Sequence, residues 1–127
     1  MSMKQLELTI THIKILDTIS LLNKRNMYPL SDGVYKIVSG ILDDETEELK
    51  DLETFGTLIS FNSKKVCRYL LALYRYGYIK KVYNKKKDKL VYVTTDLGEM
   101  TLFEFHKKHK RGYIKKRRNF KETILKM

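Results

Sequence analysis

The chain has 127 residues, 43% of them hydrophobic, which predicts one folded domain and excludes an intrinsically disordered chain. Its 26 Lys and Arg residues against 15 Asp and Glu give a formal net charge of +11, which favours nucleic acid as a partner over an anionic membrane surface. A single cysteine excludes an internal disulfide and a Cys-rich zinc site, and no apolar run approaches the roughly 18 residues of a membrane span. We therefore expect a cytoplasmic protein associated with the nucleoid.

Two helices are predicted in the first third of the chain. The first covers about residues 9–26, and Tyr28-Pro29 ends it because the residue before a proline avoids the helical region. Its apolar residues lie within one third of the helical circumference: Ile15, Leu16, Ile19 and Leu22. The second helix takes Ser31 as its N-cap. Its apolar face recurs at steps of three and four residues: Val34, Ile37, Val38, Ile41 and Leu42.

An acidic stretch follows the second helix. Seven of the 15 acidic residues lie between Asp43 and Glu53, which predicts a solvated loop that keeps nucleic acid away from this side. The stretch lacks the alternation and central glycine of an EF-hand calcium loop. Residues 49–56 are consistent with a short helix followed by a turn.

A third helix is predicted from the N-cap Asn62 to a left-handed C-cap at Gly77. Phe61 and Val66 are placed to form a hydrophobic staple. One face is apolar: Val66, Tyr69, Leu70 and Leu73. The opposite face carries three cations within about 40° of one another, with Lys65 toward the flank: Lys64, Arg68 and Arg75. Cys67 lies on the flank of the apolar face, where we expect a small buried hydrophobe.

A hairpin and a fourth helix come next. Two runs rich in Val, Ile, Tyr and Thr, residues 78–83 and 89–94, predict antiparallel strands. The tip between them is basic and includes Lys85, Lys86 and Lys87. Thr95 is expected to cap the fourth helix, whose inward residues are expected to be Leu97, Met100, Leu102 and Phe103.

The C-terminal segment is basic and amphipathic. Beyond Gly112, residues 113–127 predict either a fifth helix or a tail that orders on binding. Four consecutive cations suit phosphates or a membrane surface: Lys115, Lys116, Arg117 and Arg118. The expected organisation is a winged-helix domain over residues 1–112 followed by this segment. The fold class is α+β, mostly α, with a helix-turn-helix, a β-hairpin wing and extra N- and C-terminal helices.

Residues 34–103 resemble the RQC domain, the winged helix of RecQ-type helicases. The residues that carry the resemblance are Val34-Tyr35-Lys36-Ile37-Val38, Ile41-Leu42, Leu52, Phe55-Gly56, Ser63-Lys64-Lys65-Val66, Leu70, Leu73, Gly77-Tyr78-Ile79, Leu90 and the Thr95…Gly98 step. The resemblance implies duplex binding at junctions or ends, backbone contacts from the third helix, and an aromatic wedge on the wing, for which Tyr83 is the candidate. The chain has no Gly-x-x-x-x-Gly-Lys-Ser/Thr phosphate loop and no zinc-binding cysteines, so it looks like a free-standing RQC-like protein.

No residue grouping predicts catalysis. His106 and His109 are spaced to share a helical face, but the neighbouring lysines oppose a bound cation. His12 is expected to be a packed histidine at the rim of the core or within it. We expect no catalytic residues, no metal, no cofactor, no small-molecule substrate and no membrane partner, and therefore not an enzyme.

The sequence thus predicts non-catalytic binding of duplex or junction DNA through helix 63–76 and wing 78–94. The expected contacts are Lys64, Lys65, Arg68, Arg75, Tyr83, Lys85, Lys86, Lys87, Lys115, Lys116, Arg117 and Arg118. One alternative is a dimeric winged-helix repressor whose first and last amphipathic helices form the dimer interface. The other is an adaptor that binds RNA or an acidic protein.

Overall fold

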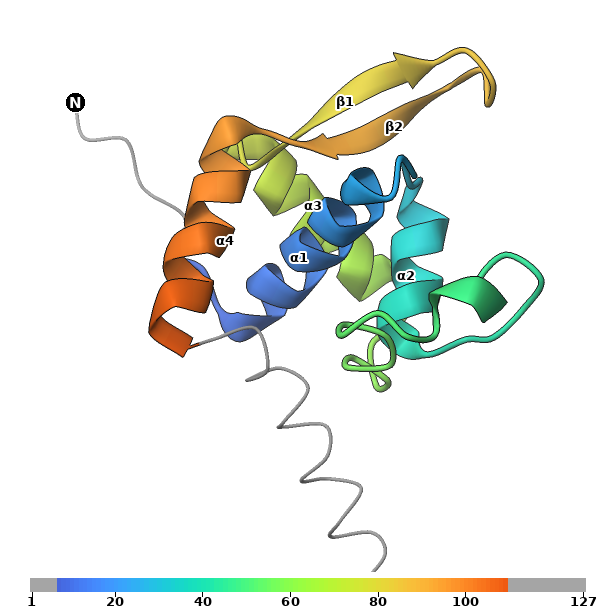
Figure 1. The fold of residues 1–127 in the computed structure, drawn as a ribbon, viewed down its shortest axis with the longest axis horizontal. Helices are drawn as coiled ribbons and strands as arrows, with labels where there is room; N and C mark the ends of the chain where they lie inside the picture. The colour runs from blue at the N-terminus through green and yellow to red at the C-terminus, as the bar shows by residue number, and fades with distance from the viewer. Residues whose placement is uncertain (1–6, 110–127) are drawn as a thin grey trace, which may run out of the picture.

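The computed structural model describes residues 7–109, which form an α+β domain that is mostly helical. Four α-helices and one antiparallel β-hairpin make up this part of the chain, in the order α1, α2, a short 3-10 turn, α3, β1, β2 and α4. Figure 1 shows α1 in the middle, with α2 and α4 on either side of it and the hairpin projecting past the helices. This arrangement is compatible with a winged helix, as predicted.

Helix α1 (Ile10–Lys24) is the centre of the domain. It contacts α2, α3, α4 and β2, and it is buried almost continuously from His12 to Leu22. Thr9 caps it, and the backbone N–H of Thr9 donates to His12 Nδ1 at 3.0 Å in a capping box. The predicted helix is confirmed, although it ends at Lys24, before a left-handed Asn26, and not at the proline. Because α1 is enclosed, the first helix cannot supply the dimer surface of the repressor alternative.

His12 is packed, as the sequence indicates. It is 8% exposed and its ring meets Tyr69 of α3 edge-on, with 4.6 Å between ring centroids. Burial lowers the pKa of His12, because desolvation disfavours the charged imidazolium.

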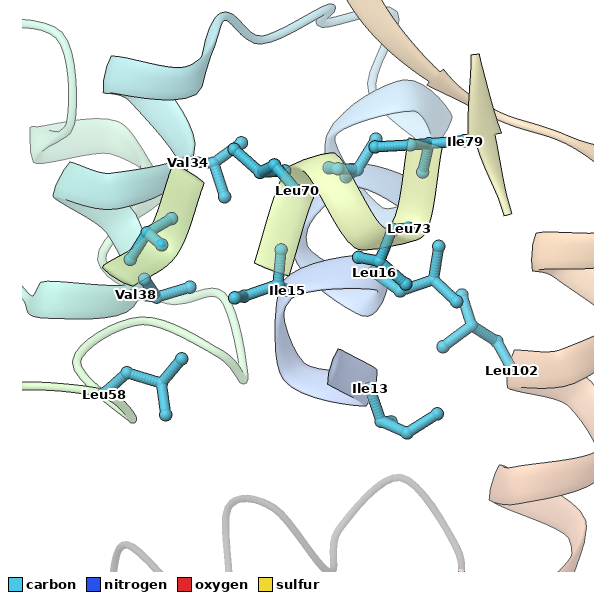
Figure 2. Packing of buried hydrophobic residues seen from close by; sticks show 12 residues of the cluster. Ile13, Ile15, Leu16, Val34, Val38, Leu58, Leu70, Leu73, Ile79 and Leu102 are labelled. Atoms are coloured by element: carbon cyan, nitrogen blue, oxygen red, sulfur yellow. The ribbon is translucent and has the colours of Figure 1, made fainter. Parts of the chain in front are cut away.

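The main core lies between α1 and the elements around it. Figure 2 shows its side chains converging from four helices, β1 and the segment before α3: Ile13, Ile15, Leu16, Val34, Val38, Leu58, Leu70, Leu73, Ile79 and Leu102. All of these residues are at most 6% exposed. A smaller cluster joins α1 and α2 to the acidic stretch: Leu22, Ile37, Leu49, Leu52 and Phe55.

Helix α2 (Ser31–Ser39) corrects two expectations. Its N-cap is Leu30, which makes no side-chain capping bond, and Ser31 is the first residue inside the helix. The helix ends at Gly40, whose positive φ of 75° reverses the chain. Ile41 and Leu42 therefore lie beyond the helix and are exposed at 37% and 55%, instead of extending its buried face.

The acidic stretch is more ordered than a solvated loop. It contains a 3-10 turn, Glu47–Leu49, where a short helix had been one open expectation for residues 49–56. Five of its seven acidic residues are exposed, Asp43 and Glu53 are partly buried, and its apolar side chains belong to the smaller core cluster. The hydroxyls of Thr18 and Thr54 are hydrogen-bonded at 2.6 Å, a buried contact that fixes the end of the stretch to α1. The apolar residues interleaved with the acids explain why this segment packs.

Helix α3 (Ser63–Arg75) follows the prediction closely. Asn62 caps it by accepting from the backbone N–H of Lys65 at 2.8 Å, and Gly77 has the expected left-handed φ of 83°. Its buried face contains Val66, Leu70 and Leu73, with Tyr69 half-buried. Cys67 is the exception: it is exposed, not a buried hydrophobe, because its place on the flank turns it away from α1.

The hairpin pairs β1 (Ile79–Asn84) with β2 (Lys89–Thr94) and confirms the predicted wing. Its base is tied to the helices by polar contacts around α1. The Asn23 side chain donates to the Tyr92 carbonyl at 3.4 Å and accepts from the Thr94 N–H at 3.0 Å. The Tyr92 N–H also donates to the Pro29 carbonyl at 2.9 Å. These bonds hold the wing at a defined angle to the body.

Helix α4 (Asp96–His109) begins at the predicted cap, where the backbone N–H of Gly98 donates to Thr95 Oγ1 at 3.1 Å. The predicted inward face is wrong except for Leu102. Gly98 and Leu102 are buried and Phe105 is half-buried. Three residues expected to face inward are exposed at 46%, 66% and 67%: Leu97, Met100 and Phe103.

The reason lies at Gly98. A Cβ there would overlap the carbonyl oxygen of Tyr78 and would come within 3.4 Å of Leu16 Cδ1. Only glycine lets the helix approach the start of β1 and α1 so closely. The face that contains Gly98 therefore turns inward, and the Met100 side turns to solvent.

Candidate nucleic-acid interface

The outer face of α3 carries cations as predicted. Lys64, Arg68 and Arg75 are all exposed and follow one another along the helix. Within residues 7–109, none of the three is in an ion pair. The exposed residues Leu71 and Cys67 lie among them, so the face combines charge with a smaller apolar contribution. Such a face can contact phosphates along its length.

Lys65 has a different place at the start of α3. Its Nζ lies 4.3 Å from the centroid of the Phe61 ring, a cation–π contact. The ammonium is exposed, but it is held beside the segment that leads into the helix. It therefore extends the charged surface at the N-terminal end of α3 and does not belong to the central line of cations.

The hairpin supplies more lysines than the predicted set. Lys85 and Lys86 stand exposed at the tip, whereas Lys87 turns back and donates to the Tyr28 carbonyl at 2.9 Å. Three exposed strand lysines were missed by the sequence interpretation: Lys80, Lys81 and Lys89. The strand pattern could have revealed them, because successive side chains of a projecting two-stranded hairpin point to opposite faces and, beyond Ile79, β1 is exposed on both.

One missed lysine joins the hairpin to α3. Lys81 Nζ lies 4.6 Å from the centroid of the Tyr74 ring on α3 and 6.0 Å from that of Tyr92, its cross-strand partner on β2. Burial, and secondarily the charge of Cys67, raise the pKa of the Tyr92 phenol. Lys81 and the Tyr74 ring thus form a direct side-chain contact between the two basic elements, β1 and α3.

Tyr83 lies near the tip, opposite Leu90, and both side chains are more than half exposed. Its phenol donates to Asp88 Oδ1 across the turn, and this hydrogen bond raises the pKa of Tyr83. The ring therefore stands on the wing with its hydroxyl held by the turn and one apolar neighbour beside it.

Three cations around the acidic stretch have carboxylate partners. Lys36 Nζ lies 2.9 Å from Asp43 Oδ2, and Arg25 Nη2 lies 3.1 Å from Asp51 Oδ2. Lys50 pairs with Glu47 at 2.9 Å. The acidic stretch therefore neutralises the positive charges around it, while the charges of α3 and the hairpin remain available. In Figure 1 the hairpin lies above α2, whereas the acidic stretch lies beside the lower half of that helix.

The two histidines that could share a metal ion, His106 and His109, make different contacts. His106 is mostly buried and its Nε2 lies 3.4 Å from Oδ1 of the fully buried Asp17, which joins α4 to α1. The His109 ring packs on Phe105, with 4.6 Å between centroids. Among the residues the structure covers, no three His, Cys, Asp or Glu side chains gather as they would around a metal ion. In the same residues no helix has the length and apolar character to cross a membrane.

Lys115, Lys116, Arg117 and Arg118 lie outside the described residues. No family model, curated protein or solved structure matches this chain.

Proposed function

We propose that this domain binds duplex or junction DNA without catalysing a reaction, using the outer face of α3 and the hairpin together. The observation that carries the proposal is the concentration of exposed cations on these two elements. Lys64, Arg68 and Arg75 are in no ion pair among residues 7–109, and they stand beside six lysines between positions 80 and 89.

The dimensions suit a duplex. Helix α3 has 13 residues and is therefore about 20 Å long, which suits the major groove, roughly 12 Å wide, or the adjacent backbone. The hairpin, fixed to α1 through Asn23, can reach the neighbouring phosphates with Lys85 and Lys86. The predicted basic C-terminal residues, Lys115 to Arg118, add sequence-independent attraction.

The resemblance to RQC domains adds a preference for forked or terminal duplexes. Tyr83 is the candidate for contact with an unpaired end, because its ring is exposed on the wing and positioned by Asp88. Association with DNA would place the protein in the cytoplasm with the nucleoid.

A fluorescence anisotropy titration tests the proposal. The full chain is titrated against a blunt duplex, a forked duplex and a single strand of equal length, each at two salt concentrations. The expected result is salt-sensitive binding to both duplexes, with the fork bound as well as the blunt end or better. Tighter binding to structured RNA than to either duplex, or no binding to any nucleic acid, would contradict the proposal and favour an adaptor for RNA or an acidic protein.

A further inference from the structure

We infer that two copies of this chain pair through the outer face of α4, with the two helices antiparallel. The first observation is the exposure of large apolar side chains on a helix that is otherwise docked. Met100 and Phe103 are 66% and 67% exposed, and Leu97 beside them is 46% exposed. Large apolar side chains gathered on one exposed face mark an interaction surface more often than isolated ones do.

The second observation is the order of residues along this face. Asp96, Met100, Phe103 and Lys107 are separated by steps of four, three and four residues, the spacing of a helix-pairing seam. By the 100° step per residue they lie within about 60° of one another. We call these four residues the α4 seam. Its apolar pair is central, with an acid at one end and a base at the other.

The order of residues in the α4 seam favours a second copy of this chain as the binding partner. When the seam faces its own copy in the antiparallel direction, Asp96 meets the partner's Lys107 and Met100 meets the partner's Phe103. The two-fold axis repeats both contacts, as an isologous interface requires. A parallel pair would instead place Asp96 against Asp96 and Lys107 against Lys107. Neither charged residue is in an ion pair among residues 7–109, so both are available for this contact.

The surroundings of the seam accept a neighbouring side chain. An open groove of about 580 Å³ lies between α4 and the end of α1, and it is lined by Met100, Leu102, Phe103 and His106 together with the charged residues Lys24, Glu99 and Glu104. A partner's Phe103 placed there would contact the Met100 thioether, a favourable sulfur–aromatic pairing. The pairing uses no residue of α3 or the hairpin, so it is independent of the proposed DNA binding. Helix α4 has 14 residues, about 21 Å, so the interface is small and its dissociation constant is expected in the micromolar range.

Sedimentation equilibrium of the full chain without nucleic acid, from about 1 to 500 µM, tests the pairing. The wild-type chain is expected to form dimers within this range. Asp96→Lys and Lys107→Asp each replace two attractions by two repulsions and should weaken the dimer by about tenfold or more. The double variant Asp96→Lys/Lys107→Asp restores both attractions and should return to within about threefold of wild type.

Glu48→Lys, an exposed position in the acidic stretch, changes the net charge as Asp96→Lys does and should leave the dimer intact. Circular dichroism confirms that each variant is folded. Phe103→Glu should also give a folded monomer. A wild-type chain that remains monomeric at 500 µM would overturn the inference, as would a dimer that the seam variants do not weaken. The inference would also be overturned if the double variant formed a dimer no tighter than the dimers of the two single variants. DNA binding does not enter this readout, so the two proposals can fail separately.

Discussion

Helices α3 and α4 both pack one face against α1, but they present opposite surfaces to solvent. The outer face of α3 is a line of cations around Arg68, whereas that of α4 is apolar around Phe103. On α3 the apolar residues at three- and four-residue spacing are the buried ones. On α4 two apolar stripes compete, and the stripe with the larger side chains is the exposed one.

The difference between α3 and α4 shows what determines the buried face of a helix when the spacing of its apolar residues allows two choices. Gly98 gives α4 the closest approach to β1 and α1, and the gain from this approach outweighs the burial of Met100 and Phe103. A small residue can therefore orient a helix more strongly than a large apolar one. Surface charge on α3 and exposed apolar area on α4 then become two separate sites.

The largest expected effect comes from the inward residue of α4. Leu102 is 3% exposed, so Leu102→Ala should lower the free energy of unfolding by about 2–5 kcal/mol through lost burial and a cavity. Met100→Ala should lower it by less than about 0.5 kcal/mol, because that side chain is mostly exposed. Urea denaturation at low protein concentration measures both variants. Equal losses, or a larger loss for Met100→Ala, would show that the face of α4 is assigned wrongly.

The next effect tests Gly98 itself. Gly98→Ala should lower the free energy of unfolding by about 1–3 kcal/mol, because the new methyl group overlaps the backbone carbonyl of Tyr78. Gly33 is the matched control in α2: the nearest atom to an added Cβ would be Pro29 Cβ, at an ordinary contact distance of 3.8 Å. Gly33→Ala should therefore be neutral or stabilising by up to about 1 kcal/mol. Thermal denaturation distinguishes the two, and an unchanged Gly98→Ala protein would rule out the close approach.

The smallest expected effect concerns the ion pair between Lys36 and Asp43, since the cations on the outer face of α3 have no such partner among residues 7–109. The Lys36 ammonium beside Asp43 holds the pKa of that carboxyl below its usual value of about 3.9. The stabilisation from this ion pair is present above pH 4 and is lost as the pH falls through the lowered pKa. Lys36→Met should raise the Asp43 pKa toward its ordinary value, as followed by NMR titration. Arg68→Met should leave it unchanged, and a shift in that control would contradict the separation of the two charge groups.

The sequence predicted α3 well because its signals are local. The cap at Asn62, the left-handed Gly77 and a single apolar stripe each depend on neighbouring residues. The wing was also found from strand-forming residues on either side of a lysine-rich turn. These elements contain most of the candidate site that lies within the described residues.

The failures involve contacts between distant parts of the chain. Lys87 is 59 residues away from Tyr28, whose carbonyl it binds, and no spacing rule predicts that contact. The overlap that orients α4 involves the backbone of Tyr78, which directly precedes β1 and lies 20 residues away from Gly98. The acidic stretch is a third case. Its many charges predict a solvated loop, but apolar residues within it, such as Leu52, pack against α1 and α2. Tertiary packing decides such cases after local preference has been satisfied.

The central claim is that the α3 cations, and not positive charge in general, bind DNA. The most direct measurement is the slope of log affinity against log salt for a duplex, which should be near −5 for about six neutralised phosphates. Lys64→Ala/Arg68→Ala/Arg75→Ala should reduce the magnitude of the slope by about 2–3, since each lost phosphate contact removes about 0.9. The control Lys24→Ala/Arg25→Ala/Lys50→Ala removes the same number of charges from residues that have carboxylate partners and should change the slope by less than about 1. Equal changes in the two triple variants would contradict the claim.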